Sequence, residues 1–160
     1  MQLTRFTDYA LRTLMYLALH RDRLVIISEI AKGYQVSENH LMKIVHRLAQ
    51  HGYIETQRGK GGGMRLARQP EAIQVGMVVR HTEENMDIAE CFDPQLRDCP
   101  MLPGCVLKFA LISARASFLE KLDSYTLADL IASKKPIESV IKITRPKISS
   151  TKKQRRAPSK

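Results

Sequence analysis

Three cysteines carry the most distinctive chemistry in this chain. Cys91, Cys99 and Cys105 are its only cysteines, and they lie within fifteen positions of one another in a sequence of 160 residues. Three prolines and Gly104 interrupt the segment, so no regular helix or strand is expected between the thiols. A structural cysteine usually lies alone in a helix or strand as a small buried residue. Three thiols in one irregular segment are instead typical of metal ligands.

The spacing of the thiols bears on which metal they would hold. Seven residues separate the first two cysteines and five separate the last two. Structural zinc sites usually have four protein ligands, often in Cys-x2-Cys pairs, and the only histidine near this segment is His81. A long wrapping loop suits the wider iron–sulfur cluster better. Three thiolates leave one iron without a cysteine, which invites a different ligand and reactivity towards small molecules. Three unrelated buried thiols are the less favoured alternative.

The sequence predicts a cytoplasmic location, where these thiols would stay reduced. The first residues mix polar and apolar side chains and lack the apolar run of a secretory signal. No stretch approaches the roughly 18–20 consecutive apolar residues of a membrane span. We therefore expect a cytoplasmic chain with no membrane association. There, an odd number of cysteines favours metal binding or redox chemistry over a disulfide framework.

The net charge of +10 is distributed unevenly along the chain. Residues 1–68 carry a net charge of +6, residues 69–133 carry −5, and residues 134–160 carry +9. A basic N-terminal third suggests binding to nucleic acid. The acidic middle, which contains the cysteines, argues against a protein that simply coats polyanions.

Helical periodicity in the N-terminal third predicts a DNA-binding motif. Residues 3–20 have one apolar stripe, with Thr4 and Thr7 as possible N-caps. A short helix is expected from Ser28, followed by a tight turn made by Gly33 with Gln35 and Val36. A longer helix is expected from a cap at Ser37 to residue 51. Its basic outer face and the tight turn before it are typical of a helix-turn-helix.

A predicted β-hairpin follows these helices. Residues 53–56 and 64–67 are short strand candidates, and four glycines around Lys60 join them. Glycines flanked by cations are costly for folding but allow close approach to a phosphate backbone. Their spacing does not match a P-loop. The hairpin and the helices together predict a winged helix-turn-helix. A small helical domain with a solvated basic face is the alternative.

The expected DNA contacts come from two elements. On the recognition helix they are Ser37, Asn39, His40, Lys43 and Arg47, the last four being candidates for reading bases. On the hairpin, phosphate or minor-groove contacts are expected from Arg58, Lys60 and Arg65. A dimer would then read two half-sites of a palindromic operator about 34 Å apart.

The remaining third of the chain predicts a dimerisation element and a tail. Residues 105–125 form a long helical pattern that is apolar on two faces, so that one face would meet a partner subunit. A capping-box pattern at Thr126–Asp129 opens a last short helix. Residues 134–160 are basic and largely disordered by composition. This tail either solubilises the chain or adds sequence-independent affinity for DNA.

These elements predict a mainly α fold with a small β-wing. The winged helix-turn-helix domain would occupy residues 1–82, and residues 83–133 would hold the cluster-binding loop and the dimerisation helix. The basic tail would follow at 134–160. No nucleophile–base pair or clustered carboxylates stand out, so we do not expect an enzyme.

Several motifs resemble one known family. The opening MQLTRFTDYALR, the wing RGKGGGMRLAR, the three-cysteine segment and the ending LDSYTLADL are similar to the NsrR family, nitric-oxide-sensing repressors of the Rrf-two superfamily. The likeness covers roughly residues 1–133, and the cysteine segment and the ending are its most specific parts. It implies a dimeric winged-helix repressor with one 4Fe–4S cluster per subunit. Nitric oxide would nitrosylate or destroy the cluster and release the operator of nitric oxide detoxification genes.

The resemblance also implies the cluster ligands. They are Cys91, Cys99 and Cys105, with Asp8 contributed by the partner subunit as the fourth. On its own, Asp8 is only a carboxylate in a first helical turn, where the helix dipole favours it. Related regulators bind a 2Fe–2S cluster through three cysteines and a histidine three residues after the last. Here that position is Lys108, which weakens the 2Fe–2S alternative.

Two other functions remain open from the sequence. The same repressor would sense redox state or iron–sulfur status if it held a 2Fe–2S cluster or bare thiols. An electron-transfer protein is a second alternative, although such a carrier needs neither the wing nor the basic recognition face.

Overall fold

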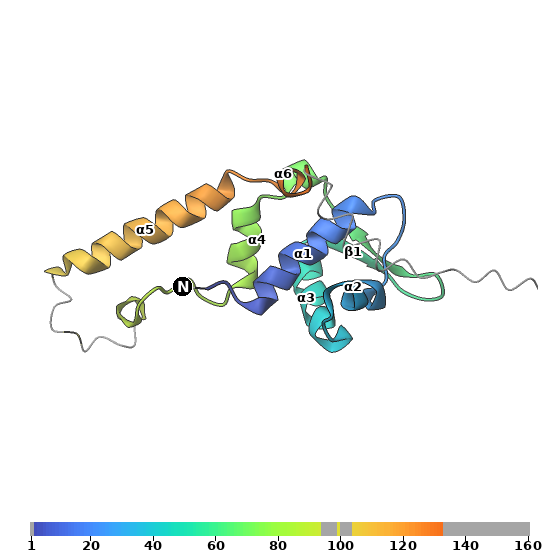
Figure 1. Ribbon diagram of the computed structural model, residues 1–160, viewed down its shortest axis with the longest axis horizontal. Coiled ribbons are helices and arrows are strands. Elements are labelled where there is room, and N and C mark those ends of the chain that lie inside the picture. Colours follow the sequence, from blue (N-terminus) through green and yellow to red (C-terminus); the bar gives the residue numbers. More distant parts are fainter. Residues whose placement is uncertain (1, 94–98, 100–103, 133–160) are drawn as a thin grey trace, which may run out of the picture.

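The computed structural model describes residues 2–93, 99 and 104–132. The tail predicted at 134–160 lies outside the described residues. The helices and strands are α1 (Arg5–Leu19), α2 (Ile27–Tyr34), α3 (Glu38–Gln50), β1 (Ile54–Gln57), β2 (Gly63–Leu66), η1 (Pro70–Ala72), α4 (Val75–Thr82), η2 (Glu90–Phe92), α5 (Val106–Asp123) and α6 (Leu127–Ile131) (Figure 1). The predicted mainly α fold with a small β-wing is confirmed.

Side-chain caps fix where two of the first three helices begin. The Thr4 hydroxyl accepts a hydrogen bond from the Thr7 amide at 3.3 Å and caps α1. The Ser37 hydroxyl does the same for the His40 amide at 3.3 Å and caps α3. Both caps were predicted from the sequence, since Ser and Thr satisfy amides that the first helical turn leaves unpaired.

Two details of α2 differ from the sequence prediction. The helix begins one residue before Ser28, and its cap position, Ile26, offers no side-chain acceptor. The turn after it includes Gln35, as predicted, but Gly33 lies within α2, and it is Gln35 that adopts the left-handed φ of 53°. Tertiary packing of Ile30 and Ala31 in the core therefore outweighs local turn preference here.

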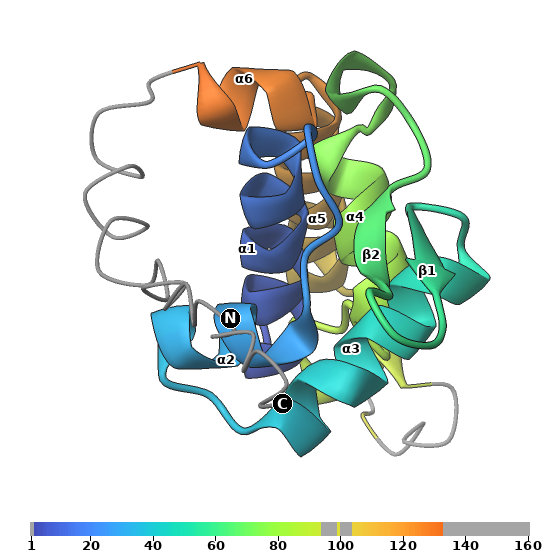
Figure 2. The same cartoon turned by 90° about the vertical axis from the view of Figure 1, so that its right-hand side faces the viewer.

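The core of the molecule lies around α1. Fully buried side chains come from α1, α2, α3, α4 and α6, and include Leu14, Ile30, Leu41, Leu48, Val78 and Leu127. Helix α1 packs against α3, α4, α6 and β2. Figure 2 shows α1 beside α4, with α6 lying across one end of the pair. Each buried residue of this size contributes about 1.5–3 kcal/mol to folding through removal from water.

The wing is an antiparallel hairpin extended by a third segment. Strands β1 and β2 pair from Ile54 with Leu66 to Gln57 with Gly63, within one residue of the predicted strands. Val25 pairs with Met64 on the open side of β2, through backbone bonds of 2.8 and 3.0 Å. A Cβ at Gly63 would lie 2.8 Å from the Val25 carbonyl, so this pairing requires glycine. The loop before α2 is thereby joined to the wing.

Helix α5 extends away from the rest of the molecule (Figure 1). It spans 18 residues, and none of its side chains is buried. One attachment is at its C-terminal end, where Arg80 of α4 holds Asp123 through two bonds of 2.6 and 2.7 Å. Close approach there depends on Gly76, because a Cβ at that position would lie 2.1 Å from the Asp123 carboxylate. No helix in the described part of the chain is long and apolar enough to cross a membrane.

The predicted domain boundaries stay predictions. Residues 83–93 leave α4 and continue to η2, while α5 returns to α4.

Candidate DNA-binding surface and cysteine segment

The outward surface of α3 is polar. The buried side chains Leu41, Ile44, Val45 and Leu48 define its inner face. At about 100° per residue, the positions directly opposite are Asn39, Lys43, His46 and Gln50, all exposed. Two of these, Asn39 and Lys43, were predicted to contact DNA. His46 was missed, although its spacing from Lys43 and Gln50 already placed it on the same face.

His40 lies differently from the other predicted base-reading residues. Its ring is half-buried and stands edge-on to Phe6 at 6.2 Å and to Tyr9 at 5.8 Å between ring centroids. Its Nε2 atom is buried without a hydrogen-bond partner in the described part of the chain. This position joins α3 to α1, and it turns the imidazole away from the outer face. Sequence periodicity places His40 at the edge of the polar stripe, so only the structure distinguishes the two orientations.

Arg47 lies on the same side of α3 as His40 and is exposed. It lines a hollow of about 260 Å³ together with residues from the start of α1 and the end of α4. Ser37, predicted as a DNA contact, uses its hydroxyl oxygen to cap α3. Its hydroxyl proton is still available as a donor.

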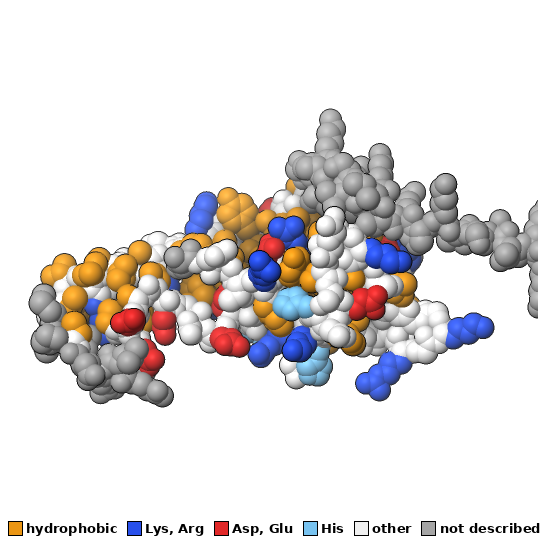
Figure 3. All heavy atoms as spheres, turned by 60° about the horizontal axis from the view of Figure 1, so that its bottom comes forward, with side chains coloured by type: hydrophobic (Ala, Val, Ile, Leu, Met, Phe, Trp, Pro, Cys, Tyr) orange, Lys and Arg blue, Asp and Glu red, His pale blue; other side chains and the backbone are white. Residues whose placement is uncertain are grey.

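The wing places two cations at its tip. Arg58 and Lys60 are exposed and make no ion pair among the described residues. Figure 3 shows Lys and Arg side chains extending into solvent at the right-hand end of the molecule, where the hairpin lies in Figure 1. Gly59 and Gly61 adopt φ values of 97° and 82°, which suit glycine and shape this tip. The predicted contact Arg65 instead pairs with Glu55 on the facing strand at 3.0 Å.

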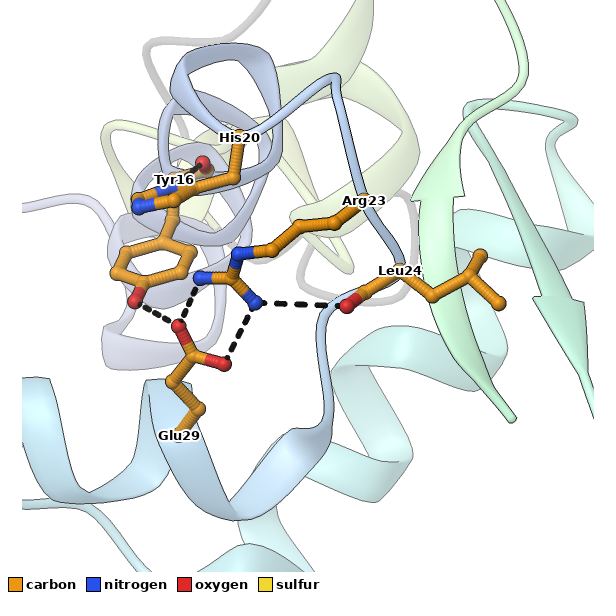
Figure 4. A network of polar contacts seen from close by, with 5 residues as sticks. All are labelled: Tyr16, His20, Arg23, Leu24 and Glu29. Carbon is orange, nitrogen blue, oxygen red and sulfur yellow. Dashed lines mark hydrogen bonds and ion pairs between the residues drawn. The ribbon is translucent and has the colours of Figure 1, made fainter. Parts of the chain in front are cut away.

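A polar network holds the loop before α2 (Figure 4). The Tyr16 hydroxyl donates to Glu29 at 2.5 Å, and Arg23 donates to both oxygens of the same carboxylate. His20 stacks on the Tyr16 ring at 4.3 Å. Burial alone would raise the pKa of Glu29, but the bonds from Arg23 and Tyr16 outweigh it and lower that pKa. The network fixes α2 against α1, and therefore also the turn that leads into α3.

A second cluster lies where α3 passes into the wing. His51 stacks on His81 of α4 with ring centroids 4.0 Å apart, and the Tyr53 hydroxyl lies 2.7 Å from His81 Nδ1. The Arg68 guanidinium lies over the Tyr53 ring at 5.3 Å. Burial lowers the pKa of His81, and His51 and Arg68 lower it further by charge repulsion. This cluster joins the C-terminal end of α3 to α4.

The three cysteines lie within or close to a stretch of which the structure describes only part. Cys91 lies in η2 and Cys105 directly precedes α5, and both are half-buried, while Cys99 is exposed. All three are free thiols. Among the described residues, no three His, Cys, Asp or Glu side chains are grouped so that they could hold a metal ion. Cysteine thiolates are nevertheless the usual ligands of iron–sulfur clusters, so the three thiols fit such a group in chemical type.

An attachment that the sequence analysis missed holds the start of this segment to α5. The Arg115 guanidinium lies over the Phe92 ring at 4.9 Å and pairs with Asp87 at 3.3 Å. A cation over an aromatic face contributes about 0.5–1 kcal/mol at an exposed site. Arg115 therefore restrains the chain on both sides of Cys91. Because these residues are distant in sequence, periodicity gave no signal for the contact.

Asp8 lies in the first turn of α1 with its side chain 48% exposed. Its carboxylate accepts a hydrogen bond from Arg12 Nε at 2.9 Å, and this bond raises the pKa of Arg12. The structure does not group Asp8 with the cysteines of its own chain. The carboxylate is therefore held on the surface, within reach of solvent.

A family model described as an iron-dependent transcriptional regulator, Rrf2, matches residues 3–133. The chain belongs to the Rrf2 family. It is 48% identical over 143 residues to an HTH-type transcriptional regulator NsrR of Geobacillus kaustophilus, covering 89% of this chain and 97% of the relative. It is also 48% identical to NsrR of Bacillus subtilis over 144 residues, 89% of this chain and 99% of the relative. These relatives confirm the predicted resemblance.

Solved structures of Rrf2-like regulators share the fold. T. potens IscR superposes with a TM-score of 0.69 at 26% identity, covering 86% of this chain and 91% of that one. CymR, the global cysteine regulator of B. subtilis, superposes with a TM-score of 0.63 at 27% identity, covering 82% and 97%. The relatives of this Rrf2 protein are named transcriptional regulators, which confirms that it is not an enzyme.

Proposed function

We propose that this Rrf2 protein is a transcriptional repressor that binds operator DNA as a homodimer and senses nitric oxide through a 4Fe–4S cluster. The observation that carries DNA binding is the exposed polar face of α3 beside a wing with two unpaired cations. The similarity to NsrR regulators over 89% of the chain supports nitric oxide as the signal.

On DNA, α3 would read bases in the major groove. Asn39 and Lys43 would reach base edges, and we add His46 because it lies on the same outward face. Arg58 and Lys60 at the tip of the wing would bind phosphates or the minor groove. Arg47, at the side of α3, would contact the backbone. His40 would support α3 from behind, through its packing on Phe6 and Tyr9.

The homodimer would form through α5. This helix exposes Val106, Leu107, Phe109 and Ile112 to extents of 79%, 66%, 65% and 39%. Exposed apolar side chains on one helix are typical of a protein interface. A second copy of α5 would cover them and would place two recognition helices for half-sites about 34 Å apart.

The cluster would be held by Cys91, Cys99 and Cys105, with Asp8 of the partner subunit as the fourth ligand. A bound cluster would supply iron that reacts with nitric oxide, most readily where a carboxylate rather than a thiolate is the ligand. Arg12 would keep the Asp8 carboxylate oriented on the surface of α1. The thiols would stay reduced in a cytoplasmic environment.

Anaerobic purification tests the proposal directly. Native mass spectrometry should show a dimer with one 4Fe–4S cluster per subunit, and the cluster absorbance should change on addition of nitric oxide. Binding to operator DNA should weaken in the same titration. A Cys99→Ser variant should lose the cluster. Asp8→Ala should keep the fold but hold a labile cluster. Unchanged cluster content and nitric oxide response in Asp8→Ala would remove Asp8 from the ligand set.

A 2Fe–2S cluster or free thiols form the second candidate sensor. The superposition on CymR supports this candidate, because a regulator named for cysteine shares the fold. The same mass spectra separate the candidates, since the two clusters add different masses and oxidation of two thiols to a disulfide removes two hydrogens.

A further inference from the structure

The segment that leads to the cysteines is attached to the first turn of α1. Glu83 directly follows α4 and precedes Cys91 by eight residues. Its Oε1 atom accepts hydrogen bonds from the Thr4 amide at 2.8 Å and from the Thr4 hydroxyl at 3.1 Å. A carboxylate acceptor makes these bonds stronger than neutral ones, and the positive end of the α1 dipole adds to them.

A buried pair stands behind this contact. The Thr7 hydroxyl donates to the Thr82 hydroxyl at 2.9 Å, and Thr82 donates its own proton to the Val78 carbonyl at 2.8 Å. Both threonines are buried. The end of α4 and the first turn of α1 are therefore joined by directed bonds, so a shift of one displaces the other.

The same part of α1 supports the recognition helix. Phe6 and Tyr9 both contact the His40 ring edge-on, and His40 lies in the first turn of α3. Arg47, two turns later, faces Thr4 and Glu83 across the hollow of about 260 Å³. The N-terminal half of α1 thus lies between Glu83 and α3.

We propose that Glu83 is a positioning residue that couples the cysteine segment to the recognition helix. A movement of residues 83–93 would pull on Thr4, and α1 would pass the shift through Phe6 and Tyr9 to His40. This inference rests on the proposed function, since it describes how a change at the cysteines would alter DNA binding. The coupling through Glu83 lies within one subunit. It would act in addition to any cluster ligand that the partner subunit provides.

Two measurements on Glu83→Ala test the coupling, with Glu84→Ala as the matched control. Glu84 is the exposed neighbouring carboxylate, so both variants lose the same charge. In the cluster-free chain, hydrogen exchange of the Thr4 amide should accelerate about tenfold or more in Glu83→Ala only. In the loaded protein, the ratio of operator Kd after and before nitric oxide should shrink by about fivefold or more in Glu83→Ala only. Cluster content should stay at the native level in both.

Glu83→Gln separates positioning from general damage. Its amide oxygen still accepts the Thr4 bonds, so this variant should recover most of the native exchange and nitric oxide response. If the native protein responds to nitric oxide and Glu83→Ala and Glu84→Ala respond equally, the coupling is overturned and the proposed function is not. A native protein whose DNA binding ignores nitric oxide overturns the proposed function and the coupling together. Unaltered Thr4 exchange in Glu83→Ala overturns the contact itself.

Discussion

The DNA-binding part and α5 bury their apolar side chains in different ways. Helices α1 to α4 close around a shared core in which Leu14, Ile44 and Leu48 are fully buried. Helix α5 has no buried side chain, and Phe109 is 65% exposed. The first region is therefore complete within one chain. Helix α5 instead exposes apolar surface to water. We therefore propose that a second copy of the chain covers this surface.

The largest effect should come from opening a cavity in the DNA-binding part. Leu48 is fully buried on the inner face of α3. Leu48→Ala should lower the free energy of unfolding by about 2–5 kcal/mol, through lost apolar burial and the remaining cavity. Gln50→Ala, on the exposed face of the same helix, should change it by less than about 0.5 kcal/mol. Urea unfolding followed by circular dichroism measures both, and equal midpoints would contradict the placement of the core.

A smaller effect, and one of a different kind, should come from α5. Phe109→Ser should raise the dimer Kd by about tenfold or more, equivalent to about 1.4 kcal/mol, because an exposed aromatic residue is a typical interface anchor. Ser113→Ala on the same helix is the control and should leave the Kd within about twofold. Sedimentation velocity over a dilution series measures the association. If Phe109→Ser sediments like the control at every concentration, α5 is not the dimer interface.

The features that could be predicted from the sequence are those that depend on neighbouring residues. Local signals located the caps at Thr4 and Ser37, the wing and the Thr126–Asp129 capping box, all of which are confirmed. Each depends on residues within a few positions of one another. Of the two apolar faces of α5, one was expected to be covered by the domain and the other by a partner subunit. The chain itself buries no side chain of either face, and the partner stays a prediction.

Long-range side-chain choices could not be predicted. His40 shares the polar stripe of α3 in sequence, but Phe6 and Tyr9, more than thirty residues earlier, draw its ring inward. Arg65 looked like a phosphate contact until the strand register placed it opposite Glu55. The Arg115 contact with Phe92 and the Glu83 contact with Thr4 likewise join distant segments. The cluster ligands remain predictions from residue type and family resemblance.

The junction between the two regions should contribute modestly. Arg80 and Asp123 form a two-bond ion pair with side chains 34% exposed. A double-mutant cycle to alanine should give a coupling of about 0.5–1 kcal/mol, whereas the more exposed Arg65–Glu55 pair should give less than about 0.5 kcal/mol. The Arg80 hydrogen bonds lower the pKa of Asp123, so this contribution should vanish on acidification through the pKa of that carboxylate in the folded state. Equal couplings would mean that the junction is no stronger than a surface pair.

The smallest effect should be a pH dependence confined to the DNA-binding part. Burial and the neighbouring His51, Arg68 and Arg80 lower the pKa of His81, so the folded state binds its proton less readily than the unfolded state. Stability should therefore be full above the ordinary histidine pKa of about 6.5 and should fall as the pH drops below it. Protonated His81 carries a proton on Nδ1, so that atom could only donate to the Tyr53 oxygen, 2.7 Å away.

Thermal melts at about pH 7.5 and about pH 5.5, on either side of that ordinary pKa, isolate this contribution. His81→Asn keeps an acceptor near Tyr53 but cannot titrate, so it should lose less Tm on acidification than the native chain. His46→Asn, on the exposed face of α3, should lose as much as the native chain. An unchanged pH dependence in His81→Asn would place the acid sensitivity elsewhere. A reduced pH dependence in His81→Asn would locate the acid sensitivity at the contact between α3 and α4. That contact lies in the region that is complete within one chain, and not at α5.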